Sequence, residues 1–477
     1  MAVIGLVLLV LSVMIALVAP IVYPFNPLRT NVGGLYAQPE WVTWFPDGYY
    51  LSKNIVVVND PSFLSPSSVQ EWTSTYDPSQ RPNLSFSYST VGPHSGAGSL
   101  QVSSTATATS TITVSKTFHY PYHGPPQQFV AQIPGGGQFQ VVAQGVSSSQ
   151  PAYVRFFINK GAAPEKSYTL WSANITADGV WQSPGYSLDS TLVEFKKALG
   201  LITPSGTYIT SLDPAQVIFS AVDDYAYGFQ VTFNGPSQVN VSILGLTLYG
   251  TAYGLLGTDN QGNDLFAQNF WGARVSLFVG LLSAFIGIGL GLIVGLLAGY
   301  KTGLTDEALM RFTDMMLVIP FLPLLIVLVG VLGASIWNII GVIGGLGWMG
   351  FARVIRSQVL SLRERPFIEA ARAAGAGTRQ ILTRHIFPNI VSLTYVNLAI
   401  SVPGAILTEA ALSFLGLFDP TVVSWGRIIN NAATQGSLTI WWWVLPPGFD
   451  IAIVSISFVL IGYALDEIFN PKLRQRR

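Results

Sequence analysis

The side chains that could carry catalytic chemistry are few in this sequence, and their spacing does not suit it. There is no cysteine, which excludes disulfides, thiolate metal sites and cysteine nucleophiles. Of the four histidines, His119 and His123 straddle Pro121, so they cannot share a helix face as paired zinc ligands. A Ser-His-Asp hydrolase would need one of these or His94, and nothing around them supports it. We therefore expect a protein that is not an enzyme.

Nucleotide binding through a phosphate-binding loop is excluded as well. That loop needs a lysine directly after a glycine, so that the ammonium group reaches the phosphates. No Gly-Lys pair occurs in the chain. We expect neither a metal nor a cofactor in this chain, and its formal net charge of zero gives no indication of nucleic acid as a partner.

One segment combines residue types and spacing that suit docking onto another protein. Between Glu369 and Gly375, four alanines favour a helix and let a partner surface come close; they are Ala370, Ala371, Ala373 and Ala374. Gly375 and Gly377 are expected to end this helix. Arg365 and Glu369 stand four apart, so they can brace the helix or reach a partner's charge. The alternative is an ordinary amphipathic surface helix.

Two further kinds of residue have a candidate role. Glu409 lies in an apolar run, where a carboxylate must find a partner or water. It either faces a transport pathway or sits just beyond the membrane, at the outer end of its helix. Three Asn-x-Ser/Thr sequons begin at Asn83, Asn174 and Asn240, and these are candidate glycosylation sites within one long polar stretch.

Composition indicates that membrane-spanning helices position these residues. The 477 residues are 50% hydrophobic and 10% charged, whereas soluble domains have about 25% charged residues. A helix of roughly 20 apolar residues crosses a bilayer core. Six spans are predicted, at residues 1–22, 275–298, 315–332, 336–351, 391–407 and 451–468. The first is expected to be an uncleaved transmembrane helix and not a secretory signal, because it carries no basic region.

The positions of lysine and arginine give the predicted orientation. Cytoplasmic loops keep their basic residues, while long domains cross a membrane largely regardless of charge. Seven arginines gather in one stretch: Arg353, Arg356, Arg363, Arg365, Arg372, Arg379 and Arg384. Two further basic groups are Lys301 with Arg311, and a tail with Lys472, Arg474, Arg476 and Arg477. With six spans, this pattern places both termini in the cytoplasm and the long polar stretch outside the cell.

That polar stretch, residues 26–251, is predicted to fold as an all-β sandwich of a jelly-roll-like kind. Short alternating runs separated by turn residues predict strands at 99–104, 111–118, 139–143, 153–159, 216–221, 229–233 and 239–249. One helix is expected at 192–199. The predicted organisation is a first transmembrane helix at 1–25, an extracellular β-rich domain at 26–251 and a core with five transmembrane helices at 252–477. The core contains a cytoplasmic loop at about 353–389.

The segment from Glu369 to Asn389 resembles the EAA loop of ABC importer permeases from bacteria and archaea. The matching positions are Glu369, Ala370, Ala371, Gly375 and Pro388, with Arg372 inside the motif; His385 and Asn389 match the dipeptide and oligopeptide branch, and Phe387 departs from the usual leucine. The segments Trp271-Gly-Ala-Arg274 and Glu409 to Gly416 resemble the same branch, while Asn263 stands where arginine is usual. The resemblance covers residues 257–477 and leaves the β-rich stretch unexplained.

This resemblance implies the ABC importer permease fold and a permease subunit for the uptake of oligopeptides or dipeptides. In that family, the EAA loop forms a coupling helix that docks onto an ATPase subunit. The implied partners are a second homologous permease, two ATPase subunits that bind ATP and magnesium, an extracellular substrate-binding protein and membrane lipid. Two alternatives stay open: the same role for oligosaccharides, and a membrane-anchored glycan-binding or solute-binding protein. Six spans argue against the second, since one helix suffices as an anchor.

Overall fold

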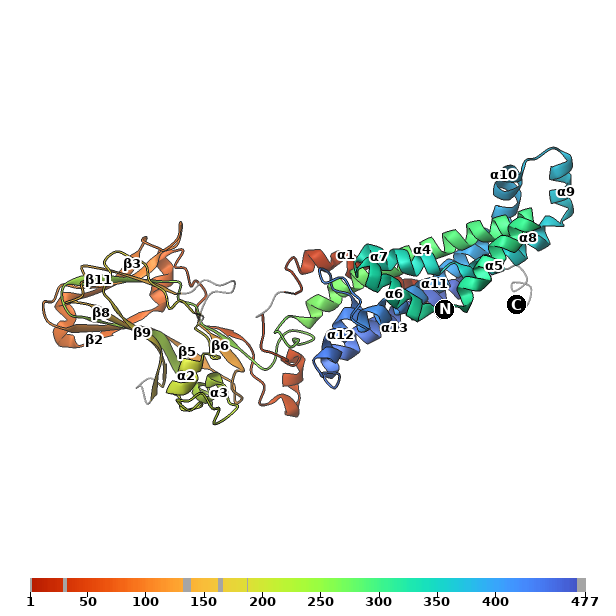
Figure 1. Cartoon of the computed structure of the whole chain (residues 1–477). Coiled ribbons are helices and arrows are strands. Elements are labelled where there is room, and N and C mark those ends of the chain that lie inside the picture. Colours follow the sequence, from red (N-terminus) through yellow and green to blue (C-terminus); the bar gives the residue numbers. More distant parts are fainter. Residues whose placement is uncertain (1, 29–31, 132–138, 162–165, 187, 470–477) are drawn as a thin grey trace. The chain divides into compact units, whose positions relative to one another are not determined.

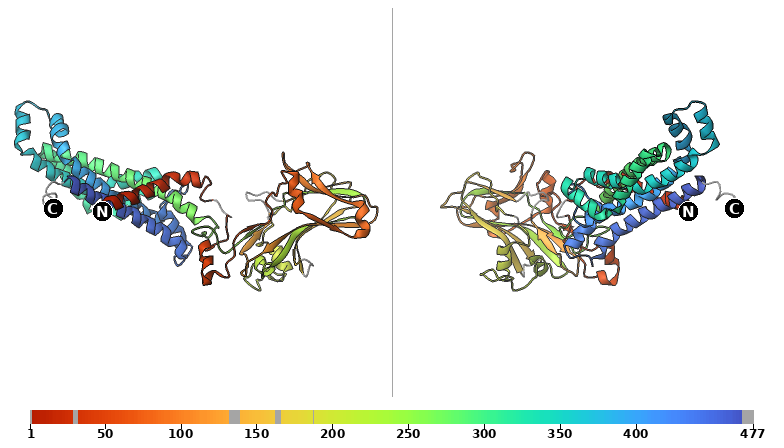
Figure 2. Two further views of the ribbon diagram at one scale, coloured as in Figure 1. Left: turned by 180° about the vertical axis from the view of Figure 1, so that it is seen from behind. Right: turned by 45° about the vertical axis from the view of Figure 1, so that its right-hand side comes forward.

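Long apolar runs of this chain fold as helices and the polar stretch between them as strands, so the chain divides into two units (Figures 1 and 2). The structure is a computed structural model that describes residues 2–28, 32–131, 139–161, 166–186 and 188–469. The predicted basic tail, Lys472 to Arg477, lies outside the described residues. Met1–Arg29 and Leu265–Arg477 make up a helical unit, and Thr30–Asp264 make up a β-rich unit.

The helical unit contains one helix from the start of the chain and a longer series after the β-rich unit. They are α1 (Ala2–Val22), α4 (Leu265–Lys301), α5 (Leu304–Val318), α6 (Phe321–Leu332), α7 (Ile336–Leu346), α8 (Met349–Arg363), α9 (Pro366–Ala373), α10 (Thr378–Ile381), the π-helix η5 (Leu382–Ile386), α11 (Phe387–Phe414), α12 (Trp425–Thr434) and α13 (Trp441–Phe469).

Within the described residues, five helical stretches are long and apolar enough to cross a membrane. They are Ala2–Val22, Leu265–Lys301, Ile336–Arg363, Thr378–Phe414 and Trp441–Ile468. The bent pair of α5 and α6 raises the number to six if it makes one crossing. The sixth predicted span therefore depends on this bent pair.

The predicted span at 315–332 is bent into two helices. α5 ends at Val318, α6 begins at Phe321, and the two helices are bent by 89°. Pro320 has no backbone N–H and disfavours a helical conformation in the residue before it. Ile319 is accordingly extended, with φ −70° and ψ 128°. The proline therefore divides one apolar run into two helices.

A ridge of glycines on α4 lets this helix approach α8 closely. A Cβ atom added to Gly291 would lie 2.7 Å from the Trp348 carbonyl oxygen, and one added to Gly295 would lie 2.6 Å from that of Ala352. At Gly299 the nearest atom would be Val359 Cβ, at 2.7 Å. Small residues at four-residue spacing allow such backbone contact between helices in lipid. The four-residue glycine pattern therefore serves packing.

The β-rich unit has twelve strands and two short α-helices in its described residues. The strands are β1 (Ile55–Val56), β2 (Thr73–Tyr76), β3 (Leu84–Ser89), β4 (Ser99–Ser104), β5 (Ser110–Tyr120), β6 (Gln128–Val130), β7 (Gln140–Gln144), β8 (Ala152–Lys160), β9 (Lys166–Ile175), β10 (Asp223–Phe233), β11 (Ser237–Ser242) and β12 (Thr247–Tyr249). The helices are α2 (Val193–Ala198) and α3 (Pro214–Ile218).

All named strand pairs are antiparallel, and alternate residues supply a common core. The sheet orders are β2-β5-β10-β8-β9, β3-β4-β11-β7 and β1-β12-β6. Val114 of β5 and Phe229 of β10 face each other in the five-stranded sheet, and both are fully buried. Val102 and Val239 do the same in the four-stranded sheet, and all four belong to one apolar cluster. Successive strand residues point to opposite faces, which explains this alternation.

Two predicted strands of this unit need correction. The run 216–221 begins inside a helix, because Asp213 caps α3: its carboxylate accepts the Ala215 N–H, and the Gln216 side chain accepts the Asp213 N–H. The run 239–249 is broken into β11 and β12, and Ile243 between them has φ 60°. A left-handed residue cannot continue a strand. The predicted helix at 192–199 is confirmed as α2.

We expect the substitution Gly295→Leu to destabilise the helical unit by forcing α4 away from α8. Overpacking of a closely packed contact costs about 1–3 kcal/mol. The measurement is thermal denaturation of the purified chain in detergent. Gly289→Leu is the matched control, because a Cβ atom on this α4 glycine has no neighbour within 4 Å. Equal transition temperatures for the two variants would show that the glycine ridge does not set this packing.

Candidate functional site

The predicted docking segment connects α8 to α11 and lies at one end of the helical unit (Figures 1 and 2). We call residues 364–389 the connecting segment. It contains α9, α10 and the π-helix η5, which runs directly into α11. Pro366 begins α9, since the first turn of a helix has no use for the missing N–H of proline. The predicted helix at Glu369 is therefore present and starts three residues earlier.

Gly375 ends α9 by adopting a left-handed conformation, with φ 81°. The Gly375 N–H donates to the Arg372 carbonyl at 2.9 Å, and the Ala376 N–H donates to that of Ala371 at 3.0 Å. This pair of bonds is the Schellman arrangement, which satisfies carbonyls at the end of a helix. Gly377 has a different role from the predicted one: with φ −71° and ψ 162°, it caps the start of α10.

One face of the connecting segment is held by the rest of the helical unit. Ile368 of α9 is fully buried in a cluster with Val359 of α8 and with Ile381 and Ile386 further along the segment. The guanidinium carbon of Arg372 lies 5.5 Å from the centre of the Tyr300 ring, a cation–π distance. These contacts fix the orientation of α9 on the ends of α4 and α8.

The opposite face of α9 is exposed. Phe367 is 43% exposed, and Glu369, Ala370 and Ala373 are exposed as well. Among the described residues, no ion pair joins Glu369 to Arg365, so the predicted internal brace is not formed here. The outward face thus offers an aromatic ring, a carboxylate and small side chains to a partner.

Beyond α9, the remaining predicted residues lie where the segment enters α11. His385 is half-buried, and its carbonyl accepts a 2.6 Å hydrogen bond from the Asn389 side chain. Pro388 occupies the first turn of α11 and is exposed, as is Phe387. Neither His385 nor Pro388 is on the outward face formed by α9 itself.

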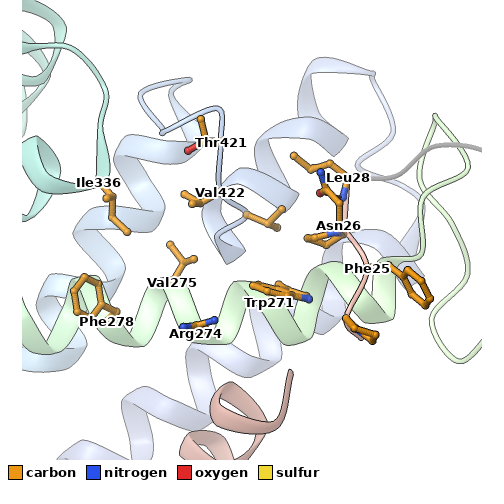
Figure 3. Close-up of a pocket in the computed structure, with 13 residues that line it drawn as sticks. Phe25, Asn26, Leu28, Trp271, Arg274, Val275, Phe278, Ile336, Thr421 and Val422 are labelled. Carbon is orange, nitrogen blue, oxygen red and sulfur yellow. Dashed lines mark hydrogen bonds between the residues drawn. The ribbon is translucent and has the colours of Figure 1, made fainter. Parts of the chain in front are cut away.

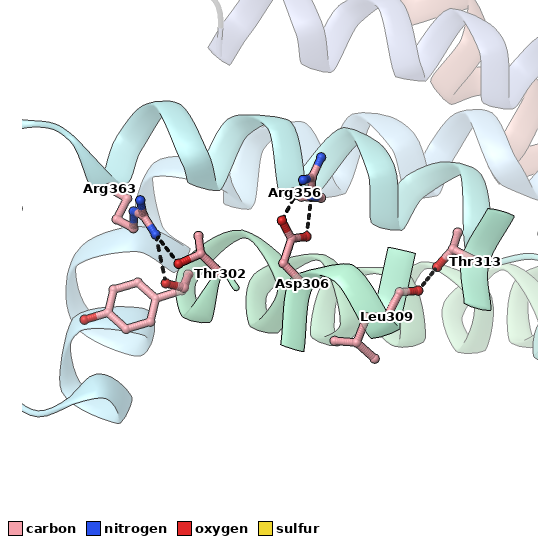
Figure 4. A network of polar contacts seen from close by, with 7 residues as sticks. Thr302, Asp306, Leu309, Thr313, Arg356 and Arg363 are labelled. Atoms are coloured by element: carbon pink, nitrogen blue, oxygen red, sulfur yellow. Dashed lines mark hydrogen bonds and ion pairs between the residues drawn. The ribbon is translucent and has the colours of Figure 1, made fainter. Parts of the chain in front are cut away.

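Polar contacts that were not predicted attach α8 to α5, to the end of α4 and to the turn between them (Figure 4). The Arg356 guanidinium donates to both carboxylate oxygens of Asp306 on α5, at 2.5 and 2.6 Å. Arg363 donates to the Thr302 hydroxyl at 3.0 Å and to the Tyr300 carbonyl at 3.4 Å. A bidentate arginine–carboxylate pair fixes geometry as well as charge. Only the acidic residues in the first turn of α5 could have indicated this pairing from the sequence.

Glu409 lies inside the helical unit. It is 2% exposed, and its carboxylate accepts hydrogen bonds from Ser413 at 2.7 Å and from Ser276 of α4 at 3.3 Å. The Ser276 hydroxyl in turn accepts the Trp425 N–H at 3.2 Å. The carboxylate therefore links α4, α11 and the start of α12.

A groove of about 290 Å³ is lined in part by Thr408 of α11, the residue before Glu409. Small and hydroxyl residues from α11 and α4 form much of its lining: Ser401, Gly404, Ala405, Thr408, Ser283, Ala284 and Gly287. The remaining lining residues are Ile288, Phe321, Ile343 and Gly347. Ser401, Gly404 and Thr408 are spaced three and four residues apart, so they share one face of α11. This spacing is the feature of the sequence from which the groove could have been predicted.

A larger cavity, about 560 Å³, lies near the start of α4 (Figure 3). Its walls are mainly apolar, with the Arg274 guanidinium carbon 5.7 Å from the Trp271 ring centre. Asp419 borders this region and accepts the Ile336 N–H at 3.1 Å. Burial alone would raise the pKa of Asp419, but hydrogen bonds from Thr421 and Ile336 hold it below its usual value.

The three sequons differ in exposure. Asn83 and Asn174 are exposed, whereas Asn240 is 1% exposed and pairs with both Gln101 and Val142 in the four-stranded sheet. A glycan cannot be attached to a buried side chain in the folded unit. Asn83 and Asn174 therefore stay as the candidate glycosylation sites.

Comparison with known proteins identifies the helical unit. The family model described as binding-protein-dependent transport system inner membrane component matches residues 291–475. The oligopeptide transport system permease protein OppC of Haemophilus influenzae is 39% identical over 223 residues, which cover 46% of this chain and 71% of that protein. This chain belongs to that permease family. The dipeptide transport system permease protein DppC of Bacillus subtilis is 35% identical to the permease over 240 residues, 50% of this chain and 75% of that one.

Among solved structures, a chain of the MetNI methionine ABC transporter in an inward-facing conformation is 20% identical to the permease. It covers 44% of this chain and 95% of that chain, with a TM-score of 0.32, which is too low to assign a shared fold. The assignment of the permease to its family depends on the sequence relatives, and its apolar helices make it a multi-pass membrane protein.

Proposed function

We propose that this permease is one of two transmembrane subunits of an ABC importer for peptides, and that it transmits motion from partner ATPases. The observation that carries the proposal is the connecting segment, where one face of α9 is held in the helical unit and the other is exposed. The names of the relatives, oligopeptide and dipeptide permeases, support peptides as the substrate class. A single-helix anchor for a binding protein would need none of the additional spanning helices.

In this proposal, the exposed face of α9 docks into a partner ATPase subunit. Phe367 provides an apolar anchor and Glu369 a charge, while the alanines allow close approach. Two such ATPases bind ATP and magnesium, and this chain supplies no catalytic residue. Movement of α9 passes to α8 and α4 through Ile368 and the Arg372–Tyr300 contact, since packed interiors transmit displacement.

The groove next to Thr408 is proposed to form one half of the translocation pathway, with a second homologous permease supplying the other half. Its glycines and hydroxyls leave space and offer hydrogen bonds, which a peptide backbone requires in a membrane interior. An extracellular binding protein would deliver the peptide. The carboxylate of Glu409, in contact with Ser276 and Ser413, would act by positioning α11 behind this surface.

The proposed orientation places the connecting segment in the cytoplasm and the β-rich unit outside the cell. It is supported by four exposed arginines of the connecting segment, which favour the cytoplasmic side: Arg365, Arg372, Arg379 and Arg384. The β-rich unit contains the two exposed sequons, which is compatible with an external position.

Coupling is tested by comparing Gly375→Val with Gly377→Val. Neither added Cβ atom meets another atom within 4 Å, so only the backbone conformation differs. A left-handed conformation costs an L-residue about 1–2 kcal/mol, whereas Gly377 has φ and ψ that valine adopts readily. We expect Gly375→Val to reduce peptide uptake at least several-fold, with weaker ATPase co-purification or unstimulated hydrolysis. Equal uptake and ATPase association in the two variants would contradict the coupling role.

The proposed pathway is tested with Gly404→Trp. An added Cβ atom at Gly404 meets nothing within 4 Å, so the variant should insert normally while its indole fills the groove. Uptake of labelled peptide by reconstituted vesicles should be nearly abolished, with ATPase subunits still bound. Gly289→Trp on α4 is the control, since this glycine is equally unobstructed and does not line the groove. Normal uptake by Gly404→Trp would exclude this groove from the pathway.

Orientation is tested with single cysteines, because the natural chain has none. In intact cells, a membrane-impermeant maleimide should label Leu64→Cys in the β-rich unit, which is 68% exposed there. Gln380→Cys in the connecting segment, also exposed, should react only after the cells are permeabilised. Labelling of Gln380→Cys in intact cells would reverse the proposed topology.

A further inference from the structure

The β-rich unit exposes four aromatic side chains on one short loop near its start. Trp44 is 81% exposed, Tyr50 70%, and Phe45 and Tyr49 each 56%. Trp44 ends the 3-10 helix η1 (Glu40–Trp44), Phe45 lies between it and the 3-10 helix η2 (Pro46–Gly48), and Tyr49 and Tyr50 follow η2. We call residues 40–50 the aromatic loop. Exposed apolar surface concentrated in this way marks an interaction site.

The aromatic loop is rigid within its unit. Gly48 packs so closely on the backbone at Val42 that an added Cβ atom would lie 2.2 Å from the Val42 carbonyl oxygen. The Tyr50 backbone packs in the same way against Gly124. Tyr49 makes edge-to-face contacts with Tyr50 and with His123, at 5.1 and 4.5 Å between ring centres. The loop backbone and the Tyr49 ring are therefore held in place within the unit.

The loop is also bonded to the last residues of the unit before the chain enters α4. The Glu40 N–H donates to the Gly254 carbonyl at 2.8 Å, and the Trp41 indole N–H donates to that of Leu255 at 3.0 Å. Leu255 is itself 57% exposed and adds aliphatic surface beside the rings. The aromatic loop and the exit of the unit thus form one patch.

Chain connectivity limits how far this patch can be from the membrane helices. Thr258 and Asp264 are bridge partners, and Leu265 is the first residue of α4. Three residues from Leu255 to Thr258 span at most about 11 Å, and adjacent strands add about 5 Å, so Leu255 lies within roughly 20 Å of the start of α4. The predicted apolar part of α4 begins near Val275, about 15 Å further along the helix. The patch is tethered within reach of the membrane surface.

The chemistry of the loop favours lipid over a charged partner. Its acidic residues are Glu40, paired with Lys53 at 3.3 Å, and Asp47, and it contains no lysine or arginine. Tryptophan and tyrosine concentrate at membrane interfaces, where their rings meet the acyl boundary and their polar atoms meet water. Binding through such rings does not need anionic lipid, unlike binding through a basic patch.

We propose that the aromatic loop lies in the headgroup region of the bilayer, with Trp44, Phe45, Tyr49 and Tyr50 in contact with lipid. This contact would hold the β-rich unit at the membrane surface. The proposal depends on the chain spanning a membrane, but not on its substrate, its ATPase partners or the side of the membrane on which the unit lies.

The test uses spin labels on single cysteines in the full chain, reconstituted in phosphatidylcholine vesicles. Labels replace Trp44 in one variant and Tyr50 in a second, so that the loss of either ring alone cannot decide the outcome. Leu64→Cys provides a label on another exposed apolar residue of the same unit, 68% exposed. Collision rates with molecular oxygen, which enters lipid, and with a water-soluble nickel chelate are measured for each label.

We expect the oxygen-to-nickel accessibility ratio to be several-fold higher at positions 44 and 50 than at position 64, and to be unchanged at high salt. Ratios at 44 and 50 equal to that at 64 would overturn the proposal. Labels shielded from both reagents would overturn it too, because they would indicate a protein partner. Insertion seen only with anionic lipid and lost in high salt would exclude aromatic partitioning as the cause. None of these readouts requires transport, so a failed uptake assay would leave the result intact.

Discussion

The contact between α4 and α8 depends on three positions of α4 that carry no side chain, and much of the helical unit follows from that contact. Helices in lipid gain little from apolar burial against each other, so close backbone packing and polar contacts must hold them together. Gly291, Gly295 and Gly299 provide the packing. α8 is thereby placed where Arg356 reaches Asp306 and where Arg363 reaches Thr302. The connecting segment then begins from a fixed base.

The arginines of residues 353–384 have two physical roles that the sequence does not separate. Arg353, Arg356 and Arg363 bond to groups on α5 or on the turn before it, so they stabilise the arrangement of helices. Arg365, Arg372, Arg379 and Arg384 are exposed on the connecting segment. The second group is exposed to a partner, although all seven arginines contribute equally when charges are counted along the chain.

The sequence allowed local features to be predicted where one residue type dictates the backbone. Gly375 was expected to end the α9 helix and does so, because a left-handed conformation suits glycine. Gly377 and the run 216–221 were misjudged, because their conformations depend on neighbours: the first on the start of α10, the second on a cap formed by Asp213. Glu409 was expected to need a partner, and Ser413 was visible four residues away. Ser276 was not, since 133 residues separate it from Glu409.

The π-helix η5 changes how the connecting segment should be measured. In an α-helix, residues five apart such as Ile381 and Ile386 point about 140° away from each other. Both are nevertheless buried in the same cluster, together with Ile390 four residues later. The wider turn, with its i→i+5 bonding, restores their common direction by including one residue that adds no net rotation. Counting residues from Thr378 to Pro388 therefore overstates the helical phase between α10 and α11 by one position.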